Sequence, residues 1–270
     1  MIAAVAQARG ARRSVLSGVF AVVAVLDLVF LVAPILFIIP LSLTSAGYLV
    51  FPPPGLSLRW YREFLGRPEW MASLLFSAEM SVVATLLTVV LGLFASIAFV
   101  RARFPGKTAI YTVVLAPMIV PLVITAIAVY LFLARLNLVG GIVGMALGLT
   151  VVTLPLFIII ASATLQGFDL RLEQAAIGLG ADPVVAFLRV TLPLIAPGVI
   201  SGALFAFLTA FDDLLIPLLL SGTATLPLSV RIWTNLITQV DPTIAAVSSF
   251  LTVVAVLILG ASALLRRASR

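Results

Sequence analysis

The sequence contains no cysteine and no histidine, and only 10% of its 270 residues are charged. The two missing residue types exclude disulfide bonds, thiolate and imidazole metal ligands, and catalytic pairs built on Cys or His. The scarcity of charge excludes an ordinary soluble domain, in which about a quarter of the residues are charged. Hydrophobic residues make up 63% of the chain instead, and the mean hydropathy is +1.30. These values predict a polytopic membrane protein.

Long apolar runs predict how often the chain crosses the membrane. A spanning helix needs about 20 mostly apolar residues at a rise of 1.5 Å each. Six segments qualify, so we predict an all-α polytopic membrane protein with one transmembrane domain over residues 1–270. The predicted spans cover residues 17–43, 72–100, 108–133, 138–165, 196–221 and 244–265. The first is longer than the apolar part of a secretory signal and is interpreted as a retained helix.

Basic residues predict the orientation, because Lys and Arg gather on the cytoplasmic side. With both termini cytoplasmic, eleven basic residues lie inside and five lie outside. We therefore predict cytoplasmic termini and a cytoplasmic loop over residues 166–195. In the outer loop over residues 44–71, a short surface helix from about 57 to 66 is expected to place its aromatic residues at the level of the lipid headgroups.

Motifs for covalent chemistry are absent. The sequence has no Gly-x-x-x-x-Gly-Lys-[Ser/Thr] loop for ATP and no His-Glu-x-x-His for zinc. Asp212 and Asp213 lack the third Asp of a magnesium–diphosphate motif, because residue 216 is Ile. We therefore predict that this chain is not an enzyme and holds no metal or cofactor. Transport, receptor and scaffold functions remain.

The loop between the fourth and fifth predicted spans carries the most informative pattern. It contains Glu-Gln-Ala-Ala at 173–176, Gly180, and Val-Thr-Leu-Pro at 190–193. This resembles the cytoplasmic coupling loop of ABC importer permeases, which reads Glu-Ala-Ala, three residues, Gly, nine residues, Ile-x-Leu-Pro. Gln174 stands where that motif has Glu, and the acid lies one position earlier in this chain. Val190 stands where the motif has Ile.

The residues of this loop also predict its local structure. Residues 171–180 favour a short helix with a small-residue surface that another protein can approach closely. Gly180 is suited to the left-handed position that ends a helix, and Asp182 to capping a second helix that starts at Pro183. We therefore predict a helix, a break and a second helix at the cytoplasmic surface. An amphipathic interfacial helix without a protein partner is the alternative.

Four acidic residues lie within the predicted spans: Asp27, Glu79, Asp212 and Asp213. An ionised group at the bilayer centre costs about 2.5–3.5 kcal/mol, so such groups should face protein or water. Glu79 and Asp212 are predicted in the outer half of the membrane, where an importer receives its substrate. Neighbouring helical residues point about 100° apart, so one aspartate of the pair is expected to line a path and the other to pair or cap elsewhere. A polar contact between helices is the alternative for the pair and the expectation for Asp27.

Further segments narrow the resemblance. They are Ala210-Phe-Asp-Asp-Leu-Leu-Ile-Pro, Leu226-Pro-Leu-Ser-Val-Arg-Ile-Trp and Asp241-Pro-Thr-Ile-Ala-Ala-Val-Ser-Ser, which look like the second permease of spermidine/putrescine importers. The resemblance implies a permease subunit of an ATP-driven importer in a bacterial inner (plasma) membrane, forming half of the pathway for polyamines or related small cationic amines. Its implied partners are a second, different permease, two ATPase subunits that carry ATP and Mg, and an extracytoplasmic binding protein. Nucleic acid is not among them.

The resemblance also implies roles for individual residues. The ATPase-coupling residues would be Arg171, Glu173, Gln174, Ala175, Ala176, Gly180, Ala181, Asp182 and Pro193. For a cationic substrate, the intramembrane acids and nearby aromatic residues predict a path that includes Phe211, Asp212, Asp213, Glu79 and Trp233. The alternative function is an ion-coupled secondary transporter that uses the intramembrane carboxylates. That alternative accounts for the acids but not for the loop pattern.

Overall fold

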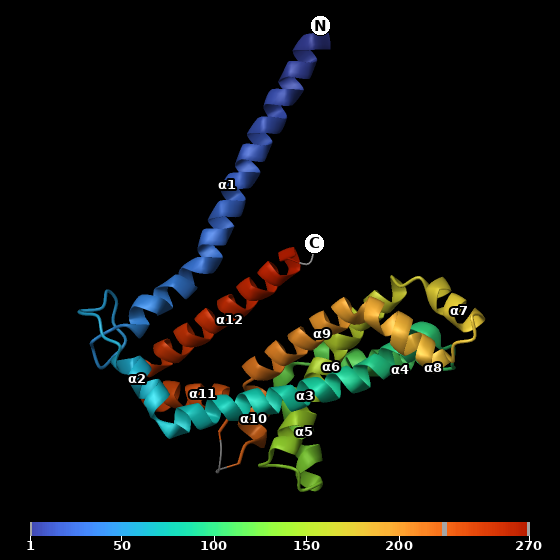
Figure 1. The fold of residues 1–270 in the computed structure, drawn as a ribbon. Helices are drawn as coiled ribbons and strands as arrows, with labels where there is room; N and C mark the ends of the chain where they lie inside the picture. The colour runs from blue at the N-terminus through green and yellow to red at the C-terminus, as the bar shows by residue number, and fades with distance from the viewer. Residues whose placement is uncertain (1, 223–225, 269–270) are drawn as a thin grey trace. The chain divides into compact units, whose positions relative to one another are not determined.

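The computed structural model describes the backbone of residues 2–222 and 226–268, with side chains from 20 to 222 and from 226 to 256. Within these residues the regular structure is helical, apart from one antiparallel bridge between Thr44 and Leu56. The predicted all-α class is therefore confirmed. The helices, labelled in Figure 1, form two compact units: Met1–Pro68 with Asn235–Arg270, and Glu69–Thr234.

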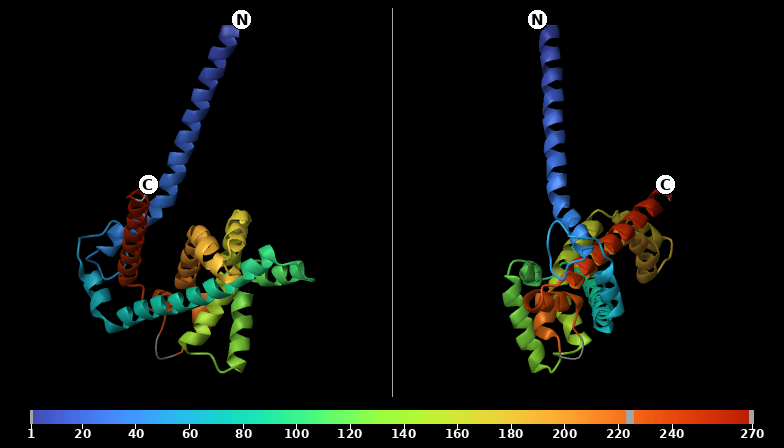
Figure 2. Two further views of the ribbon diagram at one scale, coloured as in Figure 1. Left: turned by 45° about the vertical axis from the view of Figure 1, so that its right-hand side comes forward. Right: turned by 90° about the vertical axis from the view of Figure 1, so that its left-hand side faces the viewer.

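The first unit contains three named helices, α1 (Ile2–Ser42), α2 (Arg59–Gly66) and α12 (Thr243–Ala268). α12 contacts both α1 and α2. Figure 2 shows α12 in red next to the lower part of α1 in blue. The large apolar side chains of α1 from Phe20 to Phe37 are exposed. Such a helix needs lipid or another subunit around it.

α2 is an amphipathic helix held in place by its aromatic face. Trp60 is 4% exposed, and Phe64 is fully buried. The indole Nε1 of Trp60 donates to the carbonyl of Thr44 at 2.9 Å, and the Phe64 ring lies 5.5 Å from the ring of Phe250 on α12. Both rings therefore pack inside the unit, and their expected level at the lipid headgroups stays a prediction.

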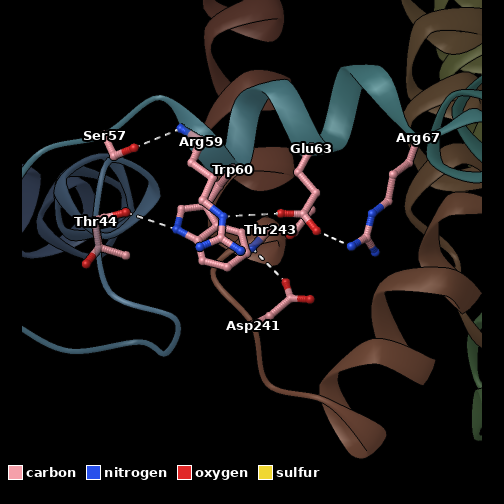
Figure 3. Close-up of polar contacts among 8 residues, drawn as sticks. All are labelled: Thr44, Ser57, Arg59, Trp60, Glu63, Arg67, Asp241 and Thr243. Atoms are coloured by element: carbon pink, nitrogen blue, oxygen red, sulfur yellow. Dashed lines mark hydrogen bonds and ion pairs between the residues drawn. The ribbon is translucent and has the colours of Figure 1, made fainter.

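Charged side chains lie beside the aromatic face of α2 (Figure 3), and the guanidinium of Arg59 lies 4.9 Å from the centre of the Trp60 ring. Glu63 lies one helical turn from both Arg59 and Arg67 and forms an ion pair with each. Nearby, the side chain of Asp241 accepts a hydrogen bond from the N–H of Thr243 at 2.8 Å, where α12 begins. Exposed pairs of this spacing contribute only about 0.3–0.5 kcal/mol each. Burial of the aromatic rings is therefore the main force that fixes α2.

Three long helices dominate the second unit: α3 (Pro68–Arg101), α6 (Ile142–Gln166) and α9 (Leu192–Asp212). α6 packs along α9, and the hydroxyls of Thr88 and Thr153 join α3 to α6 at 2.6 Å. The buried ring of Phe157 on α6 lies against Gly92 of α3 and Gly202 of α9. Small residues at these points let the helices approach closely, which is how helices associate in a membrane.

The predicted span over 108–133 is present as a broken helix. α4 (Lys107–Leu115) and the 3-10 turn η1 (Ala116–Met118) are followed by α5 (Leu122–Arg135), with a bend of 106° between them. Pro117 and Pro121 lie at this bend. A proline ring has no N–H to donate and clashes with the preceding helical turn, so two prolines four residues apart separate the helices.

The predicted span over 196–221 is shifted along the chain. Its helix begins with α8 (Pro183–Ala186) and the π turn η2 (Phe187–Thr191), which run directly into α9. The N–H of Leu192 bonds the carbonyl of Phe187, five residues back, and this wide turn precedes the ring of Pro193. The helix ends at Asp212, and the short α10 (Leu215–Leu220) follows. The helix therefore covers residues 183–212 rather than 196–221, and the part of it that lies in the membrane stays a prediction.

Four described helices are long and apolar enough to cross a membrane: Phe20–Ser42, Pro68–Arg101, Ile142–Gln166 and Pro183–Asp212. The broken pair of α4 and α5 makes a fifth if it counts as one span. In α12, the stretch Thr243–Val256 is apolar but shorter than a span within the part of the helix whose side chains are described. The remaining helix, α11 (Leu228–Thr238), is short. A multi-pass protein is therefore supported, while the number six stays a prediction.

Candidate coupling segment and substrate path

The loop over residues 166–195 contains α7 (Leu170–Gly178). The helix begins after Asp169, whose side chain accepts the N–H of Arg171 at 3.0 Å. Because the first N–H groups of a helix have no intrahelical partner, this bond stabilises the start of α7. Local capping therefore explains why the helix begins here.

A left-handed glycine ends α7. Gly180 has φ +94°, and its N–H bonds the carbonyl of Ile177 at 2.9 Å. The N–H of Ala181 bonds the carbonyl of Ala176 at 3.1 Å. These two bonds form a Schellman motif, in which a residue without Cβ takes the positive φ. The predicted helix-ending role of Gly180 is confirmed.

Asp182 caps the following helix. Its side chain accepts the N–H of Val184 at 2.9 Å, and Pro183 occupies the first helical position. The predicted helix, break and second helix are therefore confirmed. The second helix, however, continues into α9 rather than remaining in the loop. Only the short break at 179–182 separates α7 from a membrane-spanning helix.

Large apolar side chains are uncovered on the outward surface of α7 and its break, among exposed polar ones. Leu172, Ile177 and Leu179 are exposed, Leu179 by 90%. A Cβ added at Gly178 or Gly180 would meet no atom within 4 Å. Contiguous exposed apolar residues mark surfaces that a partner or a membrane covers.

The predicted coupling residues divide by burial. Those that are exposed are Arg171, Gln174, Ala175, Gly180, Asp182 and Pro193, and Ala176 and Ala181 are half-buried. Glu173 differs from all of them, because it is only 9% exposed. The exposed set is available to a partner protein, whereas Glu173 faces the rest of its own unit.

Glu173 is held by two other segments. The guanidinium of Arg101, at the end of α3, donates to both carboxylate oxygens at 2.9 and 2.8 Å. The hydroxyl of Thr191, in η2, donates to the same carboxylate. The guanidinium also lies 5.8 Å from the centre of the Phe187 ring. One buried carboxylate thus joins α7 to α3 and to the base of α9.

These contacts set the ionisation of Glu173. Burial alone would raise the pKa of its carboxyl, because the charged form loses water. The hydrogen bonds from Arg101 and Thr191, together with the positive charge of Arg101, outweigh burial and lower the pKa below the ordinary value of 4.5. Glu173 is therefore a carboxylate at neutral pH, and its charge is compensated.

The two neighbouring aspartates have different surroundings. Asp213 is 8% exposed, and its side chain accepts the N–H of Ile216 at 2.8 Å, at the start of α10. Its main-chain carbonyl accepts the hydroxyl of Ser229 at 2.9 Å. Asp212 is exposed at the last residue of α9. The capping half of the expectation is observed, because Asp213 caps a helix; Asp212 is uncovered, and its place on a substrate path stays a prediction.

The other predicted path residues are not bonded to one another within the described part of the chain. Glu79 on α3 is exposed and, like Asp212, forms no ion pair there. Phe211 is half-buried and stacks on Phe207, with ring centres 5.9 Å apart. Trp233 on α11 is 39% exposed.

Asp27 on α1 is exposed and also lacks an ion pair among the described residues. The polar helix contact expected for Asp27 is therefore not found among the residues whose side chains the structure describes.

Sequence reasoning missed Arg101 and Thr191 as partners of the coupling segment. Arg101 was counted only as one of the cytoplasmic basic residues, and it lies 72 positions before Glu173. Thr191 lies 18 positions after Glu173. The only signal in the sequence was an acidic residue one position away from its place in the motif, which turns it by about 100° on the helix.

Comparison with known proteins decides the family. Residues 89–270 match the family model described as "Binding-protein-dependent transport system inner membrane component". The chain belongs to this family. The match covers the loop, α7 and the aspartate pair, and it decides against the ion-coupled secondary transporter. A permease of this family is a transport subunit and not an enzyme.

Individual relatives agree with this assignment. The Putrescine transport system permease protein PotI of Escherichia coli K12 is 32% identical over 237 residues, covering 85% of this chain and 84% of that one. The Spermidine/putrescine transport system permease protein PotC of Haemophilus influenzae is 27% identical over 213 residues, covering 79% and 83%. The Molybdenum transport system permease protein ModB of Escherichia coli K12 is 33% identical over 159 residues, covering 54% and 69%.

A solved structure shows the same fold. The crystal structure of a bacterial ABC transporter involved in the import of the acidic polysaccharide alginate matches with a TM-score of 0.71. The match covers 94% of this permease and 96% of that chain at 15% identity. Membership in the family implies an inner-membrane location, a partner permease, an ATPase and a binding protein. It does not by itself specify a substrate.

Proposed function

We propose that this permease forms half of the translocation pathway of an ABC importer for polyamines or related small cationic amines, and that α7 is its contact with the ATPase. The complete assembly would contain six spans in this chain, a second and different permease, two ATPase subunits and one extracytoplasmic binding protein. ATP and Mg would bind to the ATPase, and this subunit would hold no cofactor. The observation that carries the ATPase contact is the exposed, capped α7 directly before α9.

The geometry of α7 supports this role. The helix is capped at both ends by its own residues, so it keeps its shape without a partner. Its exposed surface combines leucine and isoleucine side chains with alanine and glycine, which lets another protein pack closely. The break at Gly180 places this surface beside the start of the α8–η2–α9 helix. A push or pull on α7 would therefore act on a spanning helix.

Leu179→Asp tests the ATPase contact. A charge at the most exposed apolar position should weaken docking, because a carboxylate is unfavourable in an apolar groove. We expect the ATPase to be lost from the purified complex while this permease remains in the membrane at normal abundance. Leu56→Asp, at a leucine that is 76% exposed in the predicted outer loop, is the control. Normal ATPase content in the Leu179→Asp complex would refute α7 as the contact.

The surroundings of Asp212 support a cationic substrate. The residue lies at the C-terminal end of α9, where the helix dipole is negative. Its exposed carboxylate adds a full negative charge at the same place, and Phe211 beside it offers an aromatic ring. Together these groups favour an ammonium group. The coverage of the PotI match, 85% of this chain against 54% for ModB, supports the polyamine branch.

Asp212→Asn tests the substrate role, because Asn keeps the shape and removes the charge. Losing a charge-assisted contact of about 1.5–3 kcal/mol should weaken the apparent affinity for putrescine by roughly ten- to a hundredfold. Uptake into proteoliposomes containing the complete complex measures this affinity. Asp241→Asn, which keeps the oxygen that accepts the N–H of Thr243 and lies in neither proposed site, is the control. An unchanged affinity in Asp212→Asn would exclude this residue from the path.

A further inference from the structure

The carboxylate of Glu173 is the point where three segments meet. Arg101 comes from the end of α3, Thr191 from the π turn at the base of α9, and Glu173 from α7. Among the described residues, this is the one ion pair between α7 and a spanning helix. The guanidinium also lies 5.8 Å from the ring of Phe187 in the same π turn. The side chains of Arg101, Thr191 and Phe187 therefore connect α3 and the base of α9 to Glu173 on α7.

Burial makes this connection stiff. Both oxygens of the carboxylate accept hydrogen bonds from one guanidinium, an arrangement that fixes direction as well as distance. The Glu173 side chain is 12% exposed and that of Arg101 is 25% exposed, so separating the pair would leave a largely buried carboxylate without its partner, which is unfavourable. If α7 is displaced, α3 and η2 should therefore move with it rather than detach.

The acidic residue of α7 lies at position 173, which faces Arg101, and not at position 174, which is exposed. Gln174, where the family motif has Glu, is exposed. Moving the acid back by one residue turns its side chain by about 100°, from the outward face of α7 to the face that meets Arg101. In this chain the outward face is therefore neutral at residue 174, and the charge serves an internal contact.

We propose that Arg101 and Glu173 are positioning residues that transmit the displacement of α7 to α3 and, through Thr191 and Phe187, to the base of α9. This inference rests on the proposed ATPase contact of α7. Neither residue touches ATP or substrate in this role. Loss of the pair should leave the ATPase bound and hydrolysing ATP, but should uncouple hydrolysis from movement of the spans.

Glu173→Gln in the complete reconstituted complex tests the proposal. The measured quantity is labelled putrescine taken up per ATP hydrolysed, with ATPase content determined in the same preparation. We expect normal ATPase content and a fall in this ratio of at least about fivefold, the lower end of typical coupling between sites. Arg101→Lys, which keeps the charge but not the two-point geometry, should give a smaller fall. Arg103 is exposed in the loop that follows α3, and Arg103→Gln should leave the ratio unchanged.

Two double variants separate the inward role from contact with the ATPase. Glu173→Gln with Gln174→Glu restores the acid to its motif position but not the pair with Arg101, so it should remain uncoupled. Arg101→Glu with Glu173→Arg restores a reversed pair, and the Thr191 hydroxyl can accept as well as donate, so coupling should recover at least partly. Recovery in the first double variant, or no recovery in the second, would overturn the proposal. So would loss of the ATPase from the Glu173→Gln complex.

A readout that needs no transported substrate completes the test. Because the chain has no cysteine, spin labels can be placed at Arg103→Cys and at Leu170→Cys, the exposed first residue of α7, in an assembly with cysteine-free partners. We expect the distance between the labels to stay constant when a non-hydrolysable ATP analogue is added, and to change in the Glu173→Gln background. A distance that behaves alike in both backgrounds would contradict the proposal. Failure of the ATPase contact itself is seen separately, as an unchanged ATPase content in Leu179→Asp.

Discussion

Asp213 shows how one side chain determines where a spanning helix ends. The backbone of Asp213 is extended, with ψ 131°, and its N–H makes the last bond of α9, to the carbonyl of Thr209. Its side chain then accepts the N–H of Ile216 and begins α10. A helix cap requires an acceptor oxygen rather than a charge, because an amide oxygen accepts the same bond.

Replacing Asp213 by Ala should therefore destabilise the permease, and replacing it by Asn should not. Loss of a cap costs about 0.5–2 kcal/mol, which should lower the thermal midpoint of the detergent-purified protein. Asn keeps the oxygen that accepts the N–H of Ile216. Equal losses in the two variants would show that the charge of Asp213, rather than its capping oxygen, stabilises the fold.

Glu173 predicts a pH dependence of stability. Because its folded-state pKa lies below the ordinary value of 4.5, the stability that the carboxylate contributes is present above that value and is lost as pH falls through the folded-state pKa. The difference in thermal midpoint between the wild type and Glu173→Gln should therefore be largest near neutral pH and shrink below pH 4.5. A difference that stays constant down to strongly acidic pH would contradict the ionised pair with Arg101.

The local features of the candidate site were predictable from the sequence, and the long-range one was not. Gly180 and Asp182 form their bonds within a few residues of themselves, so the spacing of residue types indicates their roles. The burial of Glu173 depends on Arg101, 72 residues earlier in the chain. No local pattern contains that information, since it arises only when α3 and α7 pack into one unit.

At the scale of the elements, prolines bend the helices to different degrees. Pro117 and Pro121 lie within the predicted third span, and the structure bends there by 106°. Near Pro193 the same chemistry produces only a π turn inside a continuous helix. The outcome depends on whether neighbouring turns can rearrange around the ring, which the presence of a proline does not reveal.

Close packing of α3 on α6 predicts the effect of a single methyl group. A Cβ at Gly92 would overlap the buried ring of Phe157, so Gly92→Ala should destabilise the permease by about 1–3 kcal/mol through overpacking. Gly66→Ala in α2, where a Cβ would meet no atom within 4 Å, is the control. Thermal unfolding in detergent compares the two, and equal midpoints would contradict the observed packing.

At the scale of the whole molecule, hydropathy identified the membrane class and the long helices, because the length of an apolar run can be read directly from the sequence. Helix ends were less predictable. The fifth predicted span differs at both boundaries, since Asp213 ends its helix early and the loop before residue 196 is itself helical. A mean over many residues does not reveal a single capping side chain or a π turn, so hydropathy does not give the ends of this helix.

Orientation can be tested with cysteines in this cysteine-free chain. Leu56→Cys lies in the predicted outer loop and Arg103→Cys in a predicted cytoplasmic loop, and both positions are exposed. An impermeant thiol reagent added to intact cells should label the first and not the second, with both labelled after the membrane is opened. The opposite pattern would reverse the orientation and place α7 outside, which would rule out its contact with the ATPase.

The most direct test of the proposed function is uptake of labelled putrescine and spermidine by the complete complex in proteoliposomes. The permease, its partner permease, the ATPase and the binding protein are reconstituted together, with excess amino acids and molybdate as competitors. The account predicts uptake that requires ATP, is reduced by unlabelled polyamine but not by the other competitors, and weakens in Asp212→Asn. ATP-dependent uptake of molybdate or an amino acid with no uptake of either polyamine would contradict it.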